Sequence, residues 1–310
     1  MAWSPDGEQI ALGTSGGLWL YDTDDLSHYQ LLSAREPLDV HRIAFSHDGQ
    51  YVAANSVHTI LEPECLAPRC RYQGALYVWN RMSGKLLGKW VHGYYYSGLV
   101  TPHFTDSGRL LLAIPSLRLY EVDLADFLPT LLYQIEVPLS QPRHITFSGD
   151  GKRLFIGGGR LSGSRETFNP PPSSYHSYVY DSQTGVLISE LATESVVYDG
   201  QFDHDGSTII TSSNSGLQVW DVATATIEQG IQSLGHVAIS EDDQTIAHVN
   251  CDDIRMCDLV VDLANGDTVT HEILYRHPNY LTLQGLTVRF NDDSTRVAVT
   301  LSRQMFIFNL

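Results

Sequence analysis

Short apolar segments alternate with polar turns along the whole chain, and one five-residue pattern recurs seven times. The pattern is an apolar or small residue, a variable residue, an apolar residue, an aromatic residue or Cys, and an acidic residue or Asn. The copies are residues 18–22 (LWLYD), 76–80 (LYVWN), 117–121 (LRLYE), 177–181 (SYVYD), 217–221 (LQVWD), 254–258 (IRMCD) and 305–309 (MFIFN). Self-similarity at a spacing of roughly 40 to 60 residues indicates a repeat protein.

A tight-turn pattern precedes each copy and fixes its register. The turns resemble Ser-Pro-Asp-Gly and follow an apolar residue; they are residues 4–7, 46–49, 105–108, 148–151, 203–206, 240–243 and 291–294. Asp and Asn hydrogen-bond their own backbone and tolerate left-handed conformations, which Gly adopts without steric cost. Each tetrapeptide is therefore predicted to close a hairpin.

Short runs rich in Val, Ile and Leu follow the turns, and they are too short for helices, so they are predicted to be buried strands. A weaker fourth strand is predicted after most copies, at residues 29–32, 86–91, 131–137, 186–191, 226–230 and 268–274. Four antiparallel strands in a unit of roughly 40 residues form the blade of a β-propeller. We therefore predict an all-β fold, a seven-bladed β-propeller of four-stranded antiparallel blades with an incomplete last blade. The single domain spans residues 1–310, with units at about 1–39, 40–92, 99–138, 143–193, 196–232, 234–274 and 286–310.

The units resemble WD-repeat propellers, at the degenerate, WD-like or YVTN-type end of that family. Trp220-Asp221 is the dipeptide for which the family is named, and Tyr21-Asp22 and Tyr180-Asp181 are common variants. The resemblance covers nearly the whole chain and implies the propeller fold and an interaction scaffold. The family's Gly-His signature is mostly absent, and Gly235-His236 stands closer to the following strand than the family places it. We therefore expect the family's stiffening hydrogen-bond network to be incomplete.

The repeat is short at both ends. The first predicted strand stops at Trp3, two residues after Met1, and the last unit ends on its third strand at Leu310. Family members commonly close the ring by adding an N-terminal strand to the last blade. The resemblance therefore leads us to expect an upstream extension of the natural chain. The alternative is a tolerated three-stranded last blade.

The chain is acidic, with a formal net charge of -17. An acidic chain lacks the electrostatic footprint of a phosphate-backbone binder, so we expect no nucleic-acid partner. There is no apolar run of about 18 residues and no recognisable signal peptide, so we expect a soluble protein without membrane insertion. The acidic clusters lack the spacing of a calcium loop, and we expect neither a metal nor a cofactor. The compartment is unknown.

The four cysteines form two local pairs. Cys65 and Cys70 lie in an inserted loop and are a candidate disulfide if the compartment is oxidising. Cys257 occupies the aromatic position of the sixth copy, close to Cys251, and is interpreted as a small buried hydrophobe. The spacing does not favour a zinc site.

Two glycine-containing motifs could be mistaken for catalytic ones. Residues 13–17 match G-x-S-x-G, but they join two strands rather than a strand and a helix, so a hairpin turn is predicted. Residues 157–159 lack the spacing of a dinucleotide fingerprint. No catalytic residue is assigned from motifs.

Several polar residues stand near the start of the first strands, which line the central channel of a propeller. They are His41, Arg42, His144, Asp199 and His236. These side chains are candidates for a site at the channel mouth. The alternative is a channel filled by water and mutually paired side chains.

The long insertions fall on one predicted face of the blades, where the second strand connects to the third and each blade connects to the next. Loops on rigid scaffolds carry function, and Tyr and Arg are enriched at interaction hot spots. The candidate partner-binding residues are Tyr94, Tyr95, Tyr96, Arg69, Arg71, Tyr72, Tyr175, His176, Tyr275, Arg276, His277 and Tyr280. The alternative is that these tyrosines pack the loops against the blades.

The favoured function is a non-catalytic scaffold that binds a protein or peptide partner of unknown identity on this face. The alternative is a propeller enzyme or small-ligand binder, similar to a hydrolase or lactonase, that uses the channel mouth. Convergence of His, Asp and Arg there would favour the enzyme. A third hypothesis, compatible with the scaffold, is that the chain is one domain of a larger protein.

Overall fold

The computed structural model describes sixteen segments of the chain. They are residues 1–32, 34, 38–60, 71–93, 100–114, 118–135, 142, 144–160, 175–193, 195–213, 215–231, 236–251, 256–263, 266–274, 286–301 and 304–310. Only the backbone is described at 58–60, 71–73, 93, 158–160, 251 and 256. Within these ranges no helix is long and apolar enough to cross a bilayer.

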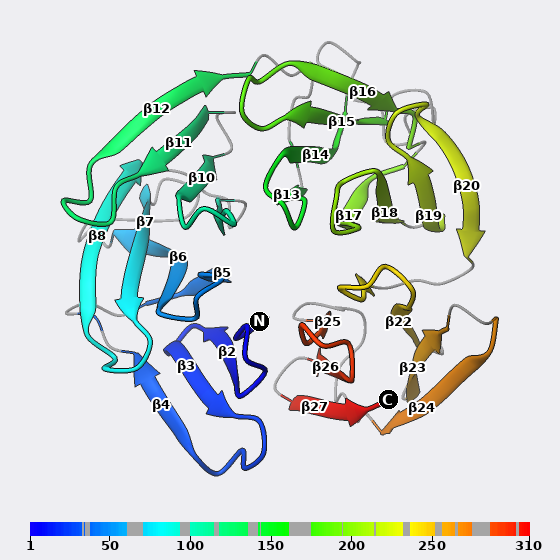
Figure 1. Ribbon diagram of the computed structural model, residues 1–310, viewed down its shortest axis with the longest axis horizontal. Coiled ribbons are helices and arrows are strands. Elements are labelled where there is room, and N and C mark those ends of the chain that lie inside the picture. The colour runs from blue at the N-terminus through cyan, green and yellow to red at the C-terminus, as the bar shows by residue number, and fades with distance from the viewer. Residues whose placement is uncertain are drawn as a thin grey trace. The chain divides into compact units, whose positions relative to one another are not determined.

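The chain divides into two compact units, and unit 1 (Met1–Glu136) contains three four-stranded antiparallel sheets, here called blades (Figure 1). The first blade consists of β1 (Ala2–Trp3), β2 (Gln9–Thr14), β3 (Gly17–Asp22) and β4 (Tyr29–Leu32). The second consists of β5 (Val40–Phe45), β6 (Tyr51–Ile60), β7 (Arg71–Asn80) and β8 (Leu86–Gly93). The third consists of β9 (Thr101–Phe104), β10 (Leu110–Ile114), β11 (Arg118–Val122) and β12 (Pro129–Gln134).

Unit 2 (Val137–Leu310) contains four blades, the last with three strands. The fourth blade consists of β13 (His144–Phe147), β14 (Arg153–Arg160), β15 (Tyr175–Asp181) and β16 (Leu187–Leu191). The fifth consists of β17 (Val197–Phe202), β18 (Thr208–Ser213), β19 (Gly216–Asp221) and β20 (Thr226–Ile231). The sixth consists of β21 (Val237–Ile239), β22 (Ile246–Cys251), β23 (Met256–Asp262) and β24 (Thr268–Leu274), and the seventh of β25 (Thr287–Phe290), β26 (Arg296–Leu301) and β27 (Gln304–Asn309). The predicted all-β fold of seven blades with an incomplete last blade is confirmed.

All seven predicted turns are present, and the fourth residue of each is left-handed. The φ values are 69° at Gly7, 67° at Gly49, 78° at Gly108, 71° at Gly151, 74° at Gly206, 59° at Asp243 and 58° at Ser294. The side chain of the first residue also forms hydrogen bonds within the turn. Ser4 Oγ, for example, donates to Asp6 Oδ1 at 2.6 Å and accepts the N–H of Gln9 at 2.9 Å.

Two turns of unit 2 keep this left-handed geometry without glycine. Their side chains bond to neighbouring turns: Asp243 Oδ1 accepts the N–H of His204 at 2.9 Å, and Ser294 Oγ accepts the N–H of Glu241 at 3.1 Å. Contacts between adjacent turns thus help to offset the strain that a side chain brings to this conformation.

Gly108 allows the cost of a side chain in the left-handed conformation to be measured without a steric clash. A Cβ at this position would meet nothing within 4 Å, so Gly108→Ala adds backbone strain without a clash. We expect a loss of about 1 kcal/mol in the free energy of unfolding, measured by chemical denaturation. Gly230 on β20 is the matched control, because it too faces open space but has no positive φ. Gly230→Ala should be neutral or slightly stabilising, and equal losses in both variants would contradict the assignment.

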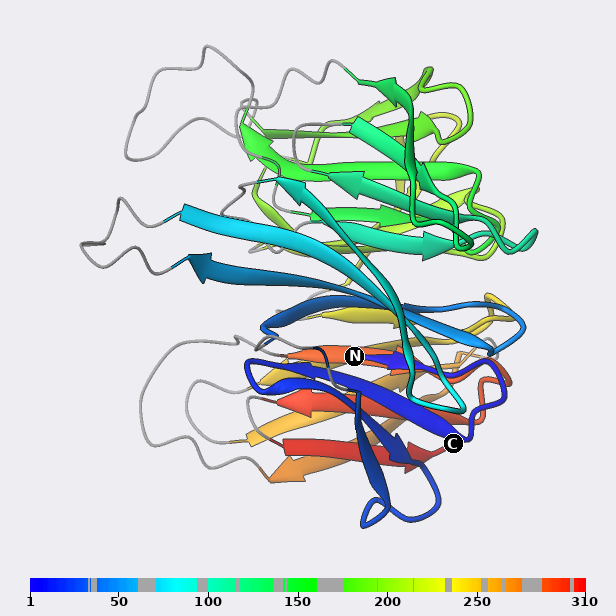
Figure 2. The same cartoon turned by 90° about the vertical axis from the view of Figure 1, so that its left-hand side faces the viewer.

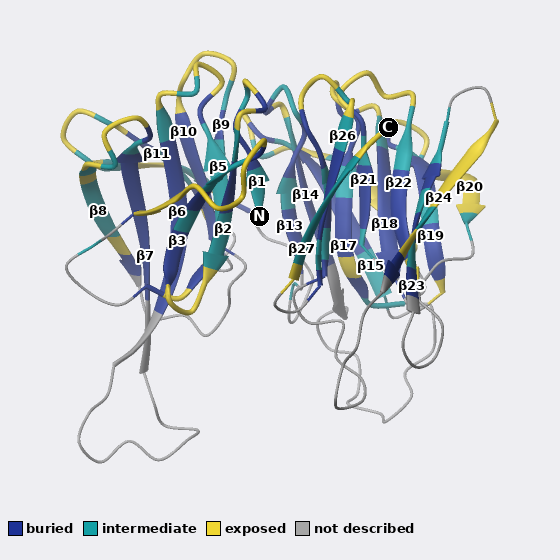
Figure 3. Ribbon diagram, turned by 90° about the horizontal axis from the view of Figure 1, so that it is seen from below, coloured by how far each residue is buried: buried dark blue, intermediate teal, exposed yellow. Residues whose placement is uncertain are grey.

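Within each unit the core lies between neighbouring blades, because the middle strands are buried on both faces (Figure 3). Along β7, Tyr77 and Trp79 pack with the first blade, whereas Leu76 and Val78 pack with the third. Alternate residues of a strand point to opposite faces. This two-sided burial explains why the middle strands read as continuous apolar runs.

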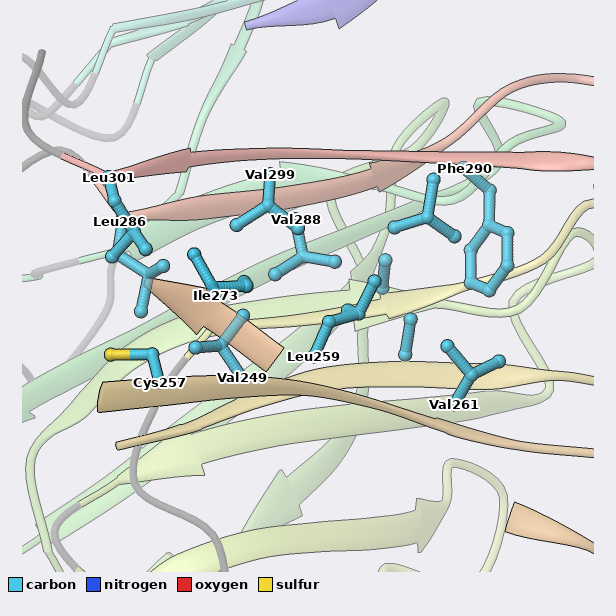
Figure 4. Close-up of a cluster of buried hydrophobic side chains, with 13 residues drawn as sticks. Val249, Cys257, Leu259, Val261, Ile273, Leu286, Val288, Phe290, Val299 and Leu301 are labelled. Atoms are coloured by element: carbon cyan, nitrogen blue, oxygen red, sulfur yellow. The ribbon is translucent and has the colours of Figure 1, made fainter. Parts of the chain in front are cut away.

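The sixth and seventh blades share a cluster of side chains that includes Val249, Leu259 and Val288 (Figure 4). Cys257 is buried at its edge, as predicted, but it is also disulfide-bonded, so the interpretation as a plain hydrophobe was wrong in that respect. In the register of β22 and β23 the residue directly opposite is Cys251. Strand β23 continues to Asp262, four residues beyond the sixth predicted copy.

Candidate functional site: the loop ends of the inner strands

The blades have two distinct ends. The first strand of each blade runs toward the tight turn, so its start lies at the end that also carries the connection from the second to the third strand. We call this the loop end, and the opposite one the turn end. In unit 1, β6 and β7 pair as far as Ile60 and Arg71, and in unit 2, β14 and β15 pair as far as Arg160 and Tyr175. These long hairpins extend at the loop end (Figure 2).

Most candidate partner-binding residues lie outside the described part of the chain. Arg71 and Tyr72 lie on β7, where only the backbone is described, and Tyr175 and His176 lie on β15. The remaining candidates, outside the described residues, are Arg69, Tyr94, Tyr95, Tyr96, Tyr275, Arg276, His277 and Tyr280. Cys65 and Cys70, the candidate disulfide, are also outside them.

His176 belongs to a polar cluster within the fourth blade. Its Nδ1 lies 2.8 Å from Glu190 Oε1, and the hydroxyl of Tyr178 donates to the same oxygen at 3.2 Å. Burial, with the nearby Glu190 carboxylate, raises the pKa of Tyr180 to about 12 and that of Tyr178 further. Both tyrosines therefore stay neutral, and this cluster links β15 to β16.

In unit 2 the structure brings together three of the five channel-mouth candidates. Asp199 on β17 lies between His144, at the start of β13, and His236, just before β21. Asp199 Oδ2 is 2.7 Å from His236 Nδ1, and Asp199 Oδ1 is 3.6 Å from His144 Nε2. The first strands of adjacent blades are neighbours, and all three residues lie toward the loop end.

The hydrogen bonds define which ring nitrogens carry protons. His144 Nε2 is 3.1 Å from the carbonyl oxygen of Gly200, so this nitrogen donates. Burial alone would raise the pKa of Asp199, but His236, followed by His144 and Arg289, holds that pKa well below its usual range. The carboxylate is therefore ionised and accepts the N–H of His236 Nδ1. His236 is left with Nε2 unprotonated when the ring is neutral.

Local backbone features direct the carboxylate inward. Strand β17 has a bulge at Tyr198, because Val197 pairs with Ser213 and Asp199 with the adjacent Ser212. Bulges re-aim side chains, and this one leaves Tyr198 exposed while Asp199 is buried. Gly200 then allows the close approach of its neighbours, because a Cβ there would come within 3.1 Å of Phe155 and 3.6 Å of His144.

The other two channel-mouth candidates belong to unit 1. His41 forms the equivalent bulge on β5, because Val40 pairs with Ser56 and Arg42 with Asn55. His41 Nε2 lies 3.6 Å from Asp39 Oδ2, and both side chains are exposed. Within unit 2 the three candidates lie together, and a site at the channel mouth stays a prediction. Arg289 on β25, which sequence reasoning missed, adds a positive charge that acts on Asp199.

The G-x-S-x-G match is a hairpin turn, as predicted. Thr14 on β2 pairs with Gly17 on β3, and the N–H of Gly16 donates to Thr14 Oγ1 at 3.0 Å. Across the described ranges, no group of three or more His, Cys, Asp or Glu side chains is arranged to hold a metal ion.

Comparisons with known proteins define the fold but not the family. No family model matches the chain, and no curated protein matches it. Among solved structures, 1238 chains match, so the fold is widespread. One is a chain in the crystal structure of the mitotic checkpoint complex, with a TM-score of 0.70 and 12% identity over 99% of this chain and 85% of that chain. At this identity the likeness shows the fold alone, a seven-bladed β-propeller.

Proposed function

We propose that this protein is a WD-like propeller that acts as a protein-interaction scaffold and binds its partner through residues at the loop ends of its blades. The observation that carries the proposal is the placement of the long hairpins β6–β7 and β14–β15, each of which extends at the loop end of its own blade. Loops held by a rigid scaffold are the usual carriers of binding residues. The similar chain in the mitotic checkpoint complex is part of a protein assembly, which supports a protein partner.

The chemistry of the loops supports a partner with acidic and apolar features. The insertions carry Tyr, Arg and His on a chain whose net charge is -17. Tyr provides a large contact area with a polar hydroxyl group, and Arg forms bidentate hydrogen bonds with carboxylates. A protein or peptide segment that presents carboxylates beside apolar side chains would match this set.

A pair of matched variants tests the face directly. The loop-end variant replaces Tyr94, Tyr95 and Tyr96 with Ser. The turn-end control replaces Met82 and Leu128 with Ser, because both are exposed in turns between third and fourth strands. Partners would be captured with the tagged wild-type chain from the cells that produce it, identified by mass spectrometry, and measured by titration against purified variants.

We expect the loop-end variant to bind the captured partner at least about 30-fold more weakly, as for the loss of a hot spot. The control should bind within about twofold of the wild type. A partner that is weakened by the control and not by the loop-end variant would contradict the proposal, and so would equal binding by all three proteins.

A further inference from the structure

Asp199 differs from the other acidic residues that pair with His in the described ranges. Its side chain is 2% exposed and faces both His236 and His144, whereas the other acidic side chains are 35% to 61% exposed. A buried carboxylate costs free energy unless its hydrogen bonds are satisfied. Asp199 meets that condition with the N–H of Gly200 at 3.1 Å and His236 at 2.7 Å.

The imidazole of His236 joins the buried carboxylate to the surface. Its Nδ1 faces Asp199, and its side chain is 28% exposed. No described residue forms a hydrogen bond with Nε2. A carboxylate behind one ring nitrogen fixes the tautomer and stabilises the imidazolium that forms when the other nitrogen takes a proton. This geometry is that of a general base.

The residue before Asp199 adds an exposed aromatic ring at the same end of the strand. Tyr198, which directly precedes Asp199, is 47% exposed on the bulge of β17. Its phenol ring stands at the loop end, where the first strands begin. A partly exposed aromatic ring offers an apolar surface and a polar hydroxyl group to a small molecule.

We propose that Asp199 and His236 form the acid–base pair of a hydrolytic site for small esters, including lactones, at the loop end of unit 2. His236 Nε2 takes a proton from water while the water oxygen bonds to the ester carbonyl carbon. The ester C–O bond then breaks, and the proton passes from Nε2 to the departing alkoxide oxygen. An open-chain ester gives an acid and an alcohol, a lactone gives one hydroxy acid, and nothing is oxidised. Asp199 is a positioning residue, and His236 is the catalytic residue.

Esters fit the groups present, because their hydrolysis needs only water and a positioned proton acceptor. The proposal stands independently of the scaffold function, since it uses the inner strands of unit 2 rather than the long loops. Failure of the ester test would leave partner capture untouched, and failure of partner capture would leave this site untouched.

The test uses the full chain with p-nitrophenyl acetate and γ-butyrolactone as probes. We expect hydrolysis above the buffer rate, a fall of about 100-fold in His236→Gln, and a fall of at least about 10-fold in Asp199→Asn. His204→Gln is the matched control, because His204 Nδ1 lies 2.7 Å from Glu241 Oε1 at the turn end. It should stay within about twofold of the wild type. Thermal unfolding followed by circular dichroism identifies any variant that fails to fold.

A second measurement needs no variant. Nitrogen-15 NMR of the wild-type histidines should show His236 protonated at Nδ1 and bare at Nε2 when the ring is neutral. A proton on Nε2 would overturn the proposal, because that nitrogen could not accept another. Hydrolysis at the buffer rate, or a rate unchanged in a folded His236→Gln, would also overturn it. Any of these results would mean that the pair only links β17 to the residue before β21.

Discussion

Trp220→Ala should lower the free energy of unfolding by about 3–5 kcal/mol, the largest effect that we expect from one side chain. Trp220 occupies the aromatic position of β19 and is buried in the cluster between the fourth and fifth blades, with Phe202 and Ile209. Its truncation leaves a cavity that the flanking strands cannot fill, because both blades pack against it. Urea denaturation gives the value.

The indole nitrogen allows packing and hydrogen bonding to be separated. Trp220 Nε1 donates to Thr211 Oγ1 at 3.0 Å, and both groups are buried. Trp220→Phe keeps most of the ring contacts but removes this bond, so it should cost about 1–2 kcal/mol. Tyr29→Ala on the exposed face of β4 is the control and should cost less than about 1 kcal/mol. A loss near zero for Trp220→Ala would mean that the aromatic position of the repeat is not a core position.

Asp6→Asn should cost about 2–3 kcal/mol at neutral pH, because it leaves the guanidinium of Arg81 without its counter-charge. Arg81 is 4% exposed and lies 2.6 Å from Asp6 Oδ2. Breaking a buried ion pair costs about 3–5 kcal/mol, and the value here is reduced because Asp6 is 43% exposed to water. The pair joins the first and second blades, so its loss should also loosen their contact.

The effect of Asp6→Asn should depend on pH. Partial burial alone would raise the pKa of Asp6, but hydrogen bonds from Arg81, Ser4 and Glu8 outweigh it and lower the pKa to about 2 from 3.8. A carboxylate with a depressed folded pKa stabilises the protein above its unfolded pKa, and that stability is lost as the pH falls through the folded value. The difference between wild type and Asp6→Asn should therefore shrink between pH 4 and pH 2.

Two further variants show whether the charge of Asp6 is responsible for the loss of stability. Asp48→Asn alters the equivalent position of the next turn, where the carboxylate accepts from Ser46 and Gln50 alone among the described residues, so it should cost less than about 0.5 kcal/mol. Arg81→Met should cost less than Asp6→Asn, because an apolar side chain of similar volume leaves no buried charge. Equal losses from Asp6→Asn and Asp48→Asn would place the stabilisation in the turn rather than in the ion pair.

The turns and middle strands could be predicted because each rests on local chemistry. A left-handed fourth position requires Gly or a small polar residue, and strands buried on both faces require unbroken apolar runs. The sixth blade shows the limit of this reasoning. Asp258 and Asp262 both follow apolar residues and lie four apart, and a shift of four keeps every side chain on the same face. The sequence therefore does not show which of the two aspartates ends the third strand, and the pairing of Asp262 with Ile246 shows that it is Asp262.

The candidate site was predictable where topology alone decides it. First strands of adjacent blades are neighbours, so residues at their starts meet, as Asp199, His144 and His236 do. Arg289 acts on Asp199 through its positive charge, and no sequence motif marks this residue. The contact between His176 and Glu190 depends on the register of β15 against β16, and the sequence contains no signal for that register.

Hydrogen–deuterium exchange of the chain, alone and with its captured partner, tests the central claim most directly, because it reports on both ends of every blade. The scaffold proposal predicts slower exchange on binding at the loop end, including the loop-end residues of β6, β7, β14 and β15. The seven tight turns should exchange at unchanged rates. Protection confined to the turns, with no change at the loop end, would contradict it.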